Sequence, residues 1–409
     1  MSRARRGDGM KGFTRARIAL VLAAVAAMGL AATAAARTHA GAAGTPITIG
    51  WAFDAKGAMA PFDGPALAAA EIRVKQVNAK GGVLGHPLVI QTCDTQNNKP
   101  PIAKACADKL LGAGANVIFT TCDVDYAAPV VQEAINRGVL AIAPCIGTDQ
   151  MGPKRFGPKG RLAFSFGNVA QDEGSAMAQY AWGRGWKTAA LATDTVIVYF
   201  KDVVAAFKAR FQQLGGKIVD QETYQSLGGS NINNVVSKWT GVKADVFVTS
   251  TAGAFGALPT LMAGLRSAGV STPVLNSWAG DGVYWLPKSP QVTNYYFVTF
   301  ANAFGHDPNP AVNTLAKQVH AATGGFVTGS AAIDGLKTAI IQTHGSTNGT
   351  LLANAMEKFH KVPTLSGLVS FSPQLHTVYG RAYRVIEINN NTPREITTIT
   401  AKVVPKING

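Results

Sequence analysis

The chain has 409 residues, of which 38 are basic and 23 acidic, so its formal net charge is +15. This length exceeds the ~100–200 residues of an ordinary domain and predicts two domains. A hydrophobic content of 47% and a charged content of 15% exclude a disordered chain, because such chains are poor in apolar residues and rich in charge. The positive charge by itself would suit a nucleic-acid or membrane partner.

The first 36 residues have the three parts of a secretory signal peptide. Basic residues from Arg3 to Arg17 are followed by an uncharged stretch, Ile18 to Ala36, that ends in small residues. This pattern predicts a cleaved signal over residues 1–36, and therefore an exported protein that is periplasmic or extracytoplasmic. The alternative is an uncleaved membrane anchor, because the uncharged stretch nearly reaches the ~20 residues that span a bilayer.

The positive charge does not concentrate in the remaining chain. Removal of the signal peptide takes away six Lys/Arg and one Asp, which lowers the net charge from +15 to about +10. Beyond residue 37, no run of basic residues is longer than Lys154-Arg155. A nucleic-acid groove needs clustered Lys and Arg, so we expect no nucleic-acid partner. A diffuse positive surface is compatible with a peripheral position at an anionic membrane surface.

Short apolar runs alternate with amphipathic stretches from residue 46 onward. In the first part of the chain, we expect strands at 47–52, 88–91, 117–120 and 140–143, and helices at 64–80, 101–111 and 127–136. The apolar runs lack polar alternation, which is typical of parallel strands that are covered on both faces. This part of the chain is therefore predicted to be an α/β domain with a parallel sheet.

The same pattern restarts after residue 166 and predicts a second α/β unit of comparable size. Its expected strands lie at 189–192, 218–219, 246–248, 274–275 and 295–299, and its expected helices at 201–214, 232–239 and 258–268. Further helices are expected near 311–323, 330–344 and 350–358, followed by a hairpin-like pair at 381–388 and 395–403. This order indicates that the two lobes are interleaved along the chain rather than consecutive.

No catalytic or metal-binding motif accompanies this pattern. Past the predicted signal peptide, the sequence lacks the G-x-S-x-G elbow, the P-loop and G-x-G-x-x-G, and its seven His never occur in H-E-x-x-H spacing. We therefore expect no enzymatic activity, no cofactor and no metal site. The four cysteines, Cys93, Cys106, Cys122 and Cys145, lack zinc-site spacing. In an exported protein their even number favours two disulfides, for which three pairings are possible.

Several strings, taken in order, carry a resemblance to a known family. They include Val77-Asn78-Ala79-Lys80-Gly81-Gly82-Val83-Leu84-Gly85, Gly138-Val139-Leu140-Ala141-Ile142-Ala143-Pro144, Leu214-Gly215-Gly216-Lys217 and Leu265-Arg266-Ser267-Ala268-Gly269. Over about residues 46–390, the chain resembles the type I periplasmic binding proteins, in particular the leucine/isoleucine/valine-binding branch that serves ABC transporters. The ordered combination, rather than any single string, carries this resemblance.

The resemblance implies an α/β fold of two doubly wound parallel-sheet lobes joined by three crossover strands. We expect lobe 1 to comprise 46–165 and 300–370, and lobe 2 to comprise 166–299 and 371–409, with crossovers near 164–167, 297–301 and 371–374. A small solute would bind between the lobes, at the carboxyl ends of the strands, and be delivered to an ABC transporter permease. The alternative is a ligand-sensing module that signals through the same cleft. The sequence up to Gly409 has no second transmembrane segment or kinase-like extension, which favours transport.

The same resemblance places the ligand-binding residues in loops that follow the strands. They are Phe62, Cys122, Asp123, Val124, Asp125, Cys145, Ile146, Gly147, Tyr199, Ala254, Trp278 and Asp281. Phe62 would supply an aromatic wall, and Tyr199 would face the ligand from lobe 2. In the implied strand order, Cys122 and Cys145 end neighbouring strands that lie ~5 Å apart, and Cys93 ends a strand beside the helix of Cys106. The disulfides 93–106 and 122–145 are therefore predicted.

Four of these positions depart from the pattern of amino-acid binders. Asp123 stands where such proteins carry a Ser for the ligand carboxylate, and Gly147 where they carry a Thr. Trp278 replaces the acidic residue that holds the ammonium group, and Ala254 replaces a second Tyr. Because Asp123 would repel a carboxylate, leucine and its relatives are not expected to bind tightly. Aromatic faces with carboxylates favour a small amine, amide or other amino-acid-like solute. Alternatively, Asp123 or Asp125 merely caps the following helix.

Overall fold

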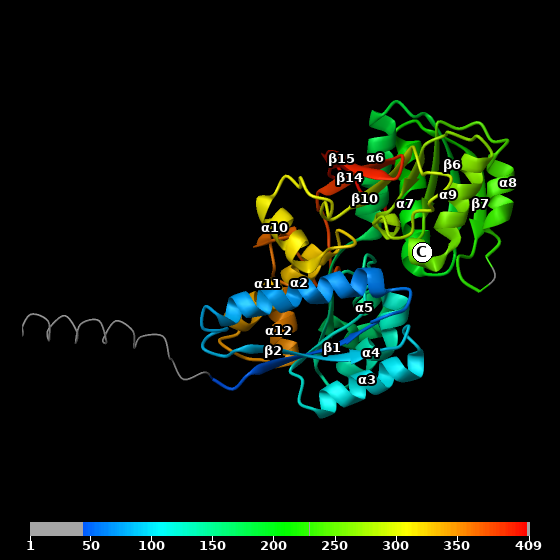
Figure 1. Cartoon of the computed structure of the whole chain (residues 1–409). Helices are drawn as coiled ribbons and strands as arrows, with labels where there is room; N and C mark the ends of the chain where they lie inside the picture. Colours follow the sequence, from blue (N-terminus) through cyan, green and yellow to red (C-terminus); the bar gives the residue numbers. More distant parts are fainter. Residues whose placement is uncertain (1–43, 229, 407–409) are drawn as a thin grey trace, which may run out of the picture.

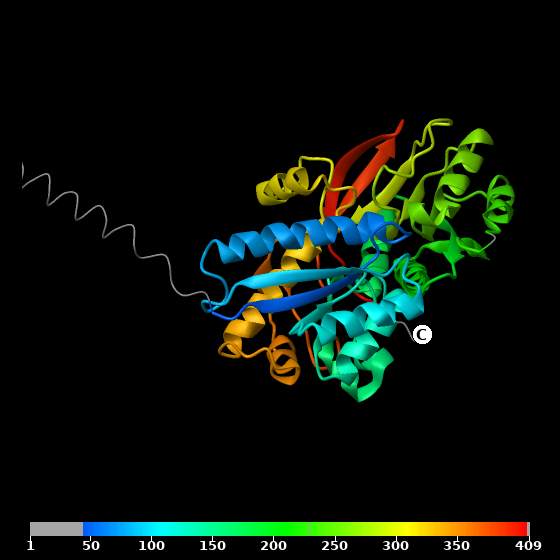
Figure 2. The same cartoon turned by 60° about the horizontal axis from the view of Figure 1, so that its bottom comes forward.

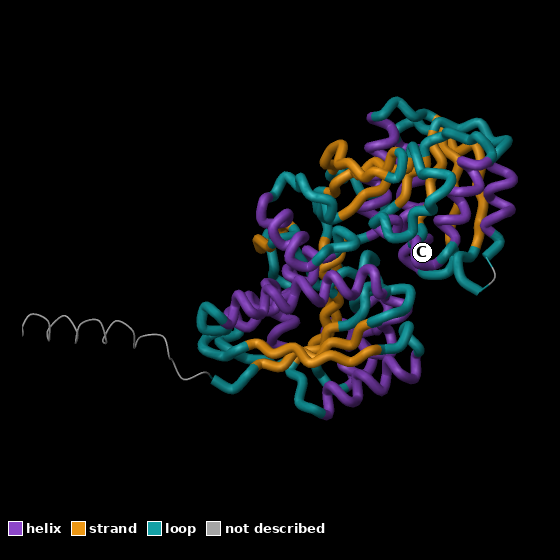
Figure 3. The backbone as a smooth tube through the Cα atoms, viewed as in Figure 1, coloured by secondary structure: helices purple, strands orange, loops and turns teal. Residues whose placement is uncertain are grey.

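The computed structural model describes residues 44–228 and 230–406, so the predicted signal peptide, residues 1–36, lies outside the described residues. The described chain forms two α/β lobes, each built on its own sheet with helices packed against it (Figure 1, Figure 3). Within these residues, no helix is long and apolar enough to cross a membrane.

Lobe 1 contains a six-stranded parallel sheet in the order β13-β5-β4-β3-β1-β2. Its strands are β1 Ile47–Phe53, β2 Leu88–Asp94, β3 Val117–Phe119, β4 Leu140–Ala143, β5 Ala163–Asn168 and β13 Thr377–Val378. Its helices are α2 Ala60–Asn78, α3 Pro100–Gly112, α4 Val124–Asn136, α5 Pro153–Phe156, α11 Phe326–Gln342 and α12 Gly349–Met356. β3 and β4 are buried along their whole length, as expected for parallel strands covered on both faces.

Lobe 2 contains a seven-stranded sheet in the order β15-β14-β10-β9-β8-β6-β7. Its strands are β6 Thr188–Asp194, β7 Lys217–Tyr224, β8 Val246–Ser250, β9 Val274–Asn276, β10 Tyr295–Thr299, β14 Tyr383–Asn389 and β15 Thr392–Ile399. Its helices are α6 Ala170–Gly183, α7 Val198–Gln213, α8 Ile232–Trp239 and α9 Ala257–Ser267. The predicted hairpin is confirmed as β14 and β15, which add an antiparallel edge to five parallel strands.

The chain passes between the lobes three times (Figure 2). It leaves lobe 1 between β5 and α6, returns between β10 and α11, and crosses again between β13 and β14. Helix α10, Pro310–Val319, lies on the second crossing and packs against α2 and α11. The crossings give the two-lobed α/β architecture that the resemblance implies.

Two lobe boundaries differ from the prediction. β5 extends to Asn168, and β13 pairs with β5, so residues 166–168 and 377–378 belong to the sheet of lobe 1 and not to lobe 2. The third crossover therefore follows Val378 instead of lying at 371–374. A strand of two residues, paired through an irregular register, is too short to produce a hydrophobic pattern in the sequence.

The sequence pattern also misses helix α6. Every residue from Ala170 to Ala178 is buried, including Gln171, Asp172 and Glu173. A helix with polar residues on its buried side has no clear apolar stripe, and the 3.6-residue period disappears. Most other predicted elements occur within a few residues of the expected positions, and α8 and β10 have the expected bounds.

Both predicted disulfides are confirmed. Cys93–Cys106 joins β2 to α3, and Cys122–Cys145 joins the loops that follow β3 and β4. The second bridge therefore ties together two loops at the carboxyl edge of the sheet in lobe 1.

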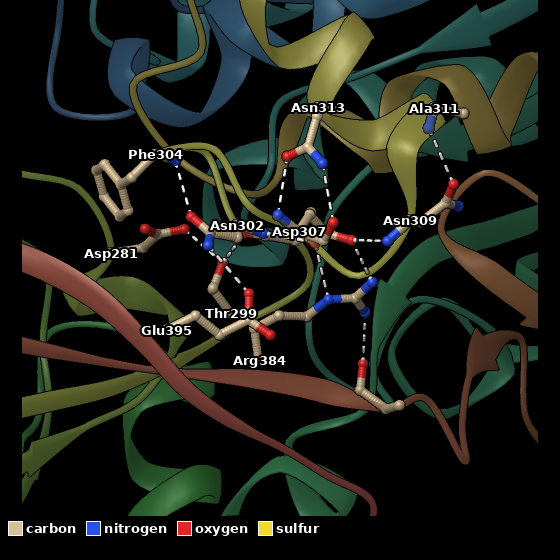
Figure 4. Close-up of polar contacts among 12 residues, drawn as sticks. Asp281, Thr299, Asn302, Phe304, Asp307, Asn309, Ala311, Asn313, Arg384 and Glu395 are labelled. Atoms are coloured by element: carbon tan, nitrogen blue, oxygen red, sulfur yellow. Dashed lines mark hydrogen bonds and ion pairs between the residues drawn. The ribbon is translucent and has the colours of Figure 1, made fainter.

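A buried ion pair holds the second crossing against lobe 2 (Figure 4). Arg384 of β14 donates two hydrogen bonds, both 2.9 Å long, to the carboxylate of Asp307 in the loop before α10. The side chain of Asp307 is fully buried, and that of Arg384 is 16% exposed. Asp307 also accepts the backbone N–H groups of Asn302 and Asn309, so the pair organises the whole loop.

We expect Asp307→Ala to lower the free energy of unfolding by about 3–5 kcal/mol, because Arg384 would keep a buried charge without a partner. Urea unfolding at neutral pH measures this loss. The control is Arg394→Ala, because Arg394 is 74% exposed in its pair with Glu387, and exposed pairs contribute little. Equal effects of the two substitutions would contradict the role assigned to Asp307.

Candidate functional site

A pocket lies where loops at the carboxyl ends of the two sheets meet. It is lined by Met59, Phe62, Cys122 and Asp123 from lobe 1, and by Ile197, Tyr199, Phe200, Ala252, Phe255, Trp278 and Ala279 from lobe 2. In α/β proteins, this edge of a parallel sheet is the usual position of a ligand. Because both lobes line the pocket, opening them exposes it and closing them encloses a solute.

Five of the eleven residues that line the pocket are aromatic. Phe62 of lobe 1 meets Trp278 of lobe 2 edge to face, with 5.0 Å between ring centroids. On the lobe 2 side, Trp278 lies 6.4 Å from Tyr199, and Phe200 lies 5.6 Å from Phe255. These contacts have the edge-to-face geometry that aromatic pairs favour. The wall is therefore a continuous aromatic surface that crosses the lobe boundary.

Gly147 makes room for one of these rings. A Cβ atom added at Gly147 would lie 2.7 Å from the ring of Tyr199, which is far inside van der Waals contact. Gly147 belongs to lobe 1 and Tyr199 to α7 of lobe 2. The absence of a side chain at position 147 therefore allows the two lobes to close around the pocket.

Asp123 lines the pocket and also caps helix α4. Its Oδ1 accepts the backbone N–H groups of Asp125, at 2.9 Å, and of Tyr126, at 3.3 Å. The capping role considered as the alternative is therefore present, but the same residue is one wall of the pocket. These two amides, which would otherwise be free at the helix N-terminus, are already occupied.

Asp125 bridges the two lobes. Its Oδ1 accepts a hydrogen bond of 2.7 Å from Arg155 of lobe 1, and its Oδ2 accepts the backbone N–H of Val198, at 2.8 Å. Val198 is the first residue of α7 in lobe 2. A carboxylate at this place satisfies an unpaired amide and interacts favourably with the helix dipole. Asp125 thus closes the lobes together without lining the pocket.

Glu173 supports the aromatic wall from behind. It is fully buried at the start of α6, where Oε2 accepts the hydroxyl of Tyr199 at 2.8 Å and Oε1 accepts the backbone N–H of Trp278 at 2.5 Å. One carboxylate therefore orients two rings of the wall. The indole N–H of Trp278 is also buried and has no hydrogen-bond partner.

Burial raises the pKa of both Asp123 and Glu173 to about 7. The charge of Asp125 raises the pKa of Asp123 further, whereas hydrogen bonds from Tyr126 and Asp125 and the charge of Arg155 oppose this. For Glu173, the hydrogen bonds from Trp278 and Tyr199 and the charge of Arg381 oppose the effect of burial. Ionising these carboxyls at neutral pH is therefore costly unless a positive charge is near.

The pocket lacks a cation of its own. None of its lining residues is Lys, Arg or His. The neighbouring Arg155 donates to Asp125 and, at 3.1 Å, to Gln150. Arg381 belongs to the third crossing, where it donates to the carbonyl of Phe166 and lies 4.8 Å from the ring of Phe300. The described residues therefore leave Asp123 without a cation bonded to it.

The structure brings five of the twelve predicted site residues together in the pocket, namely Phe62, Cys122, Asp123, Tyr199 and Trp278. Asp125 and Gly147 lie at the lobe boundary beside it. Cys145 is held behind the wall by its disulfide to Cys122.

The remaining four predicted residues do not line the pocket. Val124 and Ile146 pack into the hydrophobic core of lobe 1, and Ala254 is absent from the lining set. Asp281 is fully buried, and its Oδ2 accepts the hydroxyl of Thr299 and the backbone N–H of Gly324, both at 2.5 Å (Figure 4). Burial raises the pKa of Asp281 to about 7. Because its hydrogen-bond partners are Thr299 and Gly324, Asp281 holds the second crossing and does not line the pocket.

Sequence reasoning misses six residues that line the pocket, together with Glu173 behind it. The six are Met59, Ile197, Phe200, Ala252, Phe255 and Ala279. Each of the six lies within three residues of a predicted one, so closeness in sequence is the available signal. Glu173 lies on α6, the helix that the pattern does not reveal.

Comparisons with known proteins agree with this architecture. A sequence model of the periplasmic binding proteins matches residues 46–393. The Leu/Ile/Val-binding protein homolog 3 of Brucella melitensis is 24% identical over 343 residues, which cover 81% of this chain and 89% of that protein.

Solved structures show the same fold. LivJ from Streptococcus pneumoniae, in complex with isoleucine, superposes with a TM-score of 0.74 at 17% identity, covering 88% of this chain and 100% of the other. A solute binding protein of an ABC transporter from Rhodopseudomonas palustris, in complex with 3,4-dihydroxybenzoic acid, has a TM-score of 0.72 at 18% identity, covering 88% and 99%. The match over residues 46–393 shows that the chain belongs to the periplasmic binding protein family, and its two sheets and three crossings give it the same fold as these solved structures.

Proposed function

We propose that this protein captures a small solute between its two lobes outside the cytoplasm and delivers it to an ABC transporter permease. The observation that carries the proposal is the pocket itself, which is lined from both lobes at the carboxyl ends of their strands. A binding site divided between two bodies couples ligand capture to lobe closure. When the two lobes close, they present a combined surface that the open form lacks. A permease can recognise that surface.

The chemistry of the pocket supports a ligand other than a standard branched-chain amino acid. Binding an α-carboxylate requires free N–H donors or a cation. Here three side-chain carboxylates occupy the nearby amides, because Asp123 accepts the N–H groups of Asp125 and Tyr126, Asp125 that of Val198, and Glu173 that of Trp278. The protein thus places its own carboxylates where a ligand carboxylate would find donors. An amine, an amide or another amino-acid-like solute without a free carboxylate fits better.

A solute that stays bound during purification would identify the ligand. Native mass spectrometry of freshly purified protein is expected to show a co-purifying small molecule. Its absence, together with the absence of any solute that changes the separation of the lobes, would argue against solute capture.

We expect L-leucine to produce no measurable heat of binding in isothermal titration at millimolar concentration. The physical reason is that Asp123 repels the leucine carboxylate and no basic side chain lines the pocket to compensate the desolvation of that carboxylate. Micromolar affinity for leucine would contradict this proposal about specificity, although not the proposal of solute capture.

We expect Asp125→Ala to open the lobes of the free protein. The substitution removes the cap of α7, which lies across the boundary, and a cap of this kind contributes roughly a fivefold change in an equilibrium. Small-angle X-ray scattering should therefore report a larger radius of gyration. Asp108→Ala is the matched control, because Asp108 pairs only with exposed partners on lobe 1. An unchanged radius for Asp125→Ala would remove this role for the residue.

A further inference from the structure

The proposed pocket combines an aromatic wall with an uncompensated carboxylate. From this combination we infer that the solute is a small organic cation, such as an amidinium or a substituted ammonium. The inference rests on the proposed function of solute capture and adds the charge of the ligand to it. Three observations support this inference. They are the aromatic lining, the hydrogen bonds of Asp123 and the position of the nearby basic residues.

Aromatic side chains from both lobes line the pocket. Phe62 and Trp278 approach from opposite lobes, and Tyr199, Phe200 and Phe255 continue the wall within lobe 2. Aromatic faces attract a cation that lies within about 6 Å of a ring centroid, and the attraction strengthens when the cation is removed from water. All five side chains are nearly fully buried, so a cation held between them would be shielded from water.

Asp123 supplies the charge that such a ligand would neutralise. Its side chain is 3% exposed, and its described hydrogen-bond donors are the two backbone amides of α4. A buried carboxylate that accepts only neutral donors is much less stable than one paired with a cation. Arg155 does not fill this role, because its nearest carboxylate partner is Asp125 at 2.7 Å. A ligand cation would complete the pairing that the protein leaves open.

A neutral amide is the competing class. Its carbonyl oxygen could accept the indole N–H of Trp278, which is buried without a partner. An amide, however, leaves the charge of Asp123 uncompensated, whereas a cation interacts with both the carboxylate and the rings. The two classes therefore differ in their dependence on Asp123, and this difference can be measured.

Three probes with the same ring separate the possibilities: benzamidine, which is a cation, benzamide, which is neutral, and benzoate, which is an anion. Isothermal titration at pH 8 is expected to show benzamidine binding at least about tenfold more tightly than benzamide, and benzoate not binding. The ratio corresponds to the strength of a desolvated cation–π and charge interaction. Tighter binding of benzamide or benzoate, or no binding of any probe, would overturn the cationic class.

Asp123→Asn tests the carboxylate directly. Asn is as good a helix cap as Asp, so the variant should fold. We expect it to bind benzamidine about tenfold more weakly and benzamide unchanged, while Asp108→Asn, on the exposed face of α3, alters neither. Equal effects on both probes, or none on benzamidine, would show that Asp123 acts only as a cap.

The pH dependence provides a second readout. Burial raises the pKa of Asp123 to about 7, and the titratable or charged groups that act on it are Asp125, Tyr126 and Arg155. A cation favours ionised Asp123, so the affinity for benzamidine should fall as the pH is lowered from about 8 to 6. The Asn variant should show a weaker dependence on pH, because only Glu173 behind the wall, whose pKa burial also raises to about 7, still titrates beside the pocket. A co-purifying solute that is neutral or anionic would overturn the cationic class but leave solute capture intact.

Discussion

The pocket depends on the way in which the backbone amides at the lobe boundary find hydrogen-bond partners. When two parallel sheets meet at their carboxyl edges, the first amides of the following helices point into the interface and must be satisfied there. Three acidic side chains do this, with Asp123 capping α4, Asp125 reaching across to α7 and Glu173 holding the segment at Trp278. These contacts satisfy donors that a carboxylate ligand would otherwise use. The remaining surface is apolar, and half of its residues are aromatic.

The same carboxylates connect the pocket to the crossings between the lobes. Glu173 lies in the first turn of α6, immediately after the first crossing, and Arg381 on the third crossing favours its charged form. Arg381 also contacts the carbonyl of Phe166, in the strand that leads into the first crossing, and the ring of Phe300 on the second crossing. One guanidinium therefore links β5 to the second and third crossings. A change in the separation of the lobes must rearrange the surroundings of Arg381 and, through Glu173, the orientation of the aromatic wall.

The charge of the pocket differs in sign from the net charge of the whole chain. The protein is basic as a whole, with a formal net charge of +15, yet its pocket contains a carboxylate and no basic side chain. Long-range attraction of anions by the surface therefore does not indicate what the pocket binds. Local geometry, where water is excluded and interactions are less screened, has the larger effect on the choice of ligand.

The sequence by itself determined the α/β class, the interleaved lobes and most element positions, because apolar runs and helix-ending glycines are local signals. With the family resemblance it also indicated the disulfides and five residues of the pocket, all of which follow strand ends. Only the tertiary structure decided that Asp125 acts across the boundary, that Asp281 belongs to the second crossing, and that Glu173 supports Tyr199 and Trp278. These roles join residues 18 to 105 positions apart. Such pairings depend on how the two lobes pack, and no periodicity along the chain encodes them.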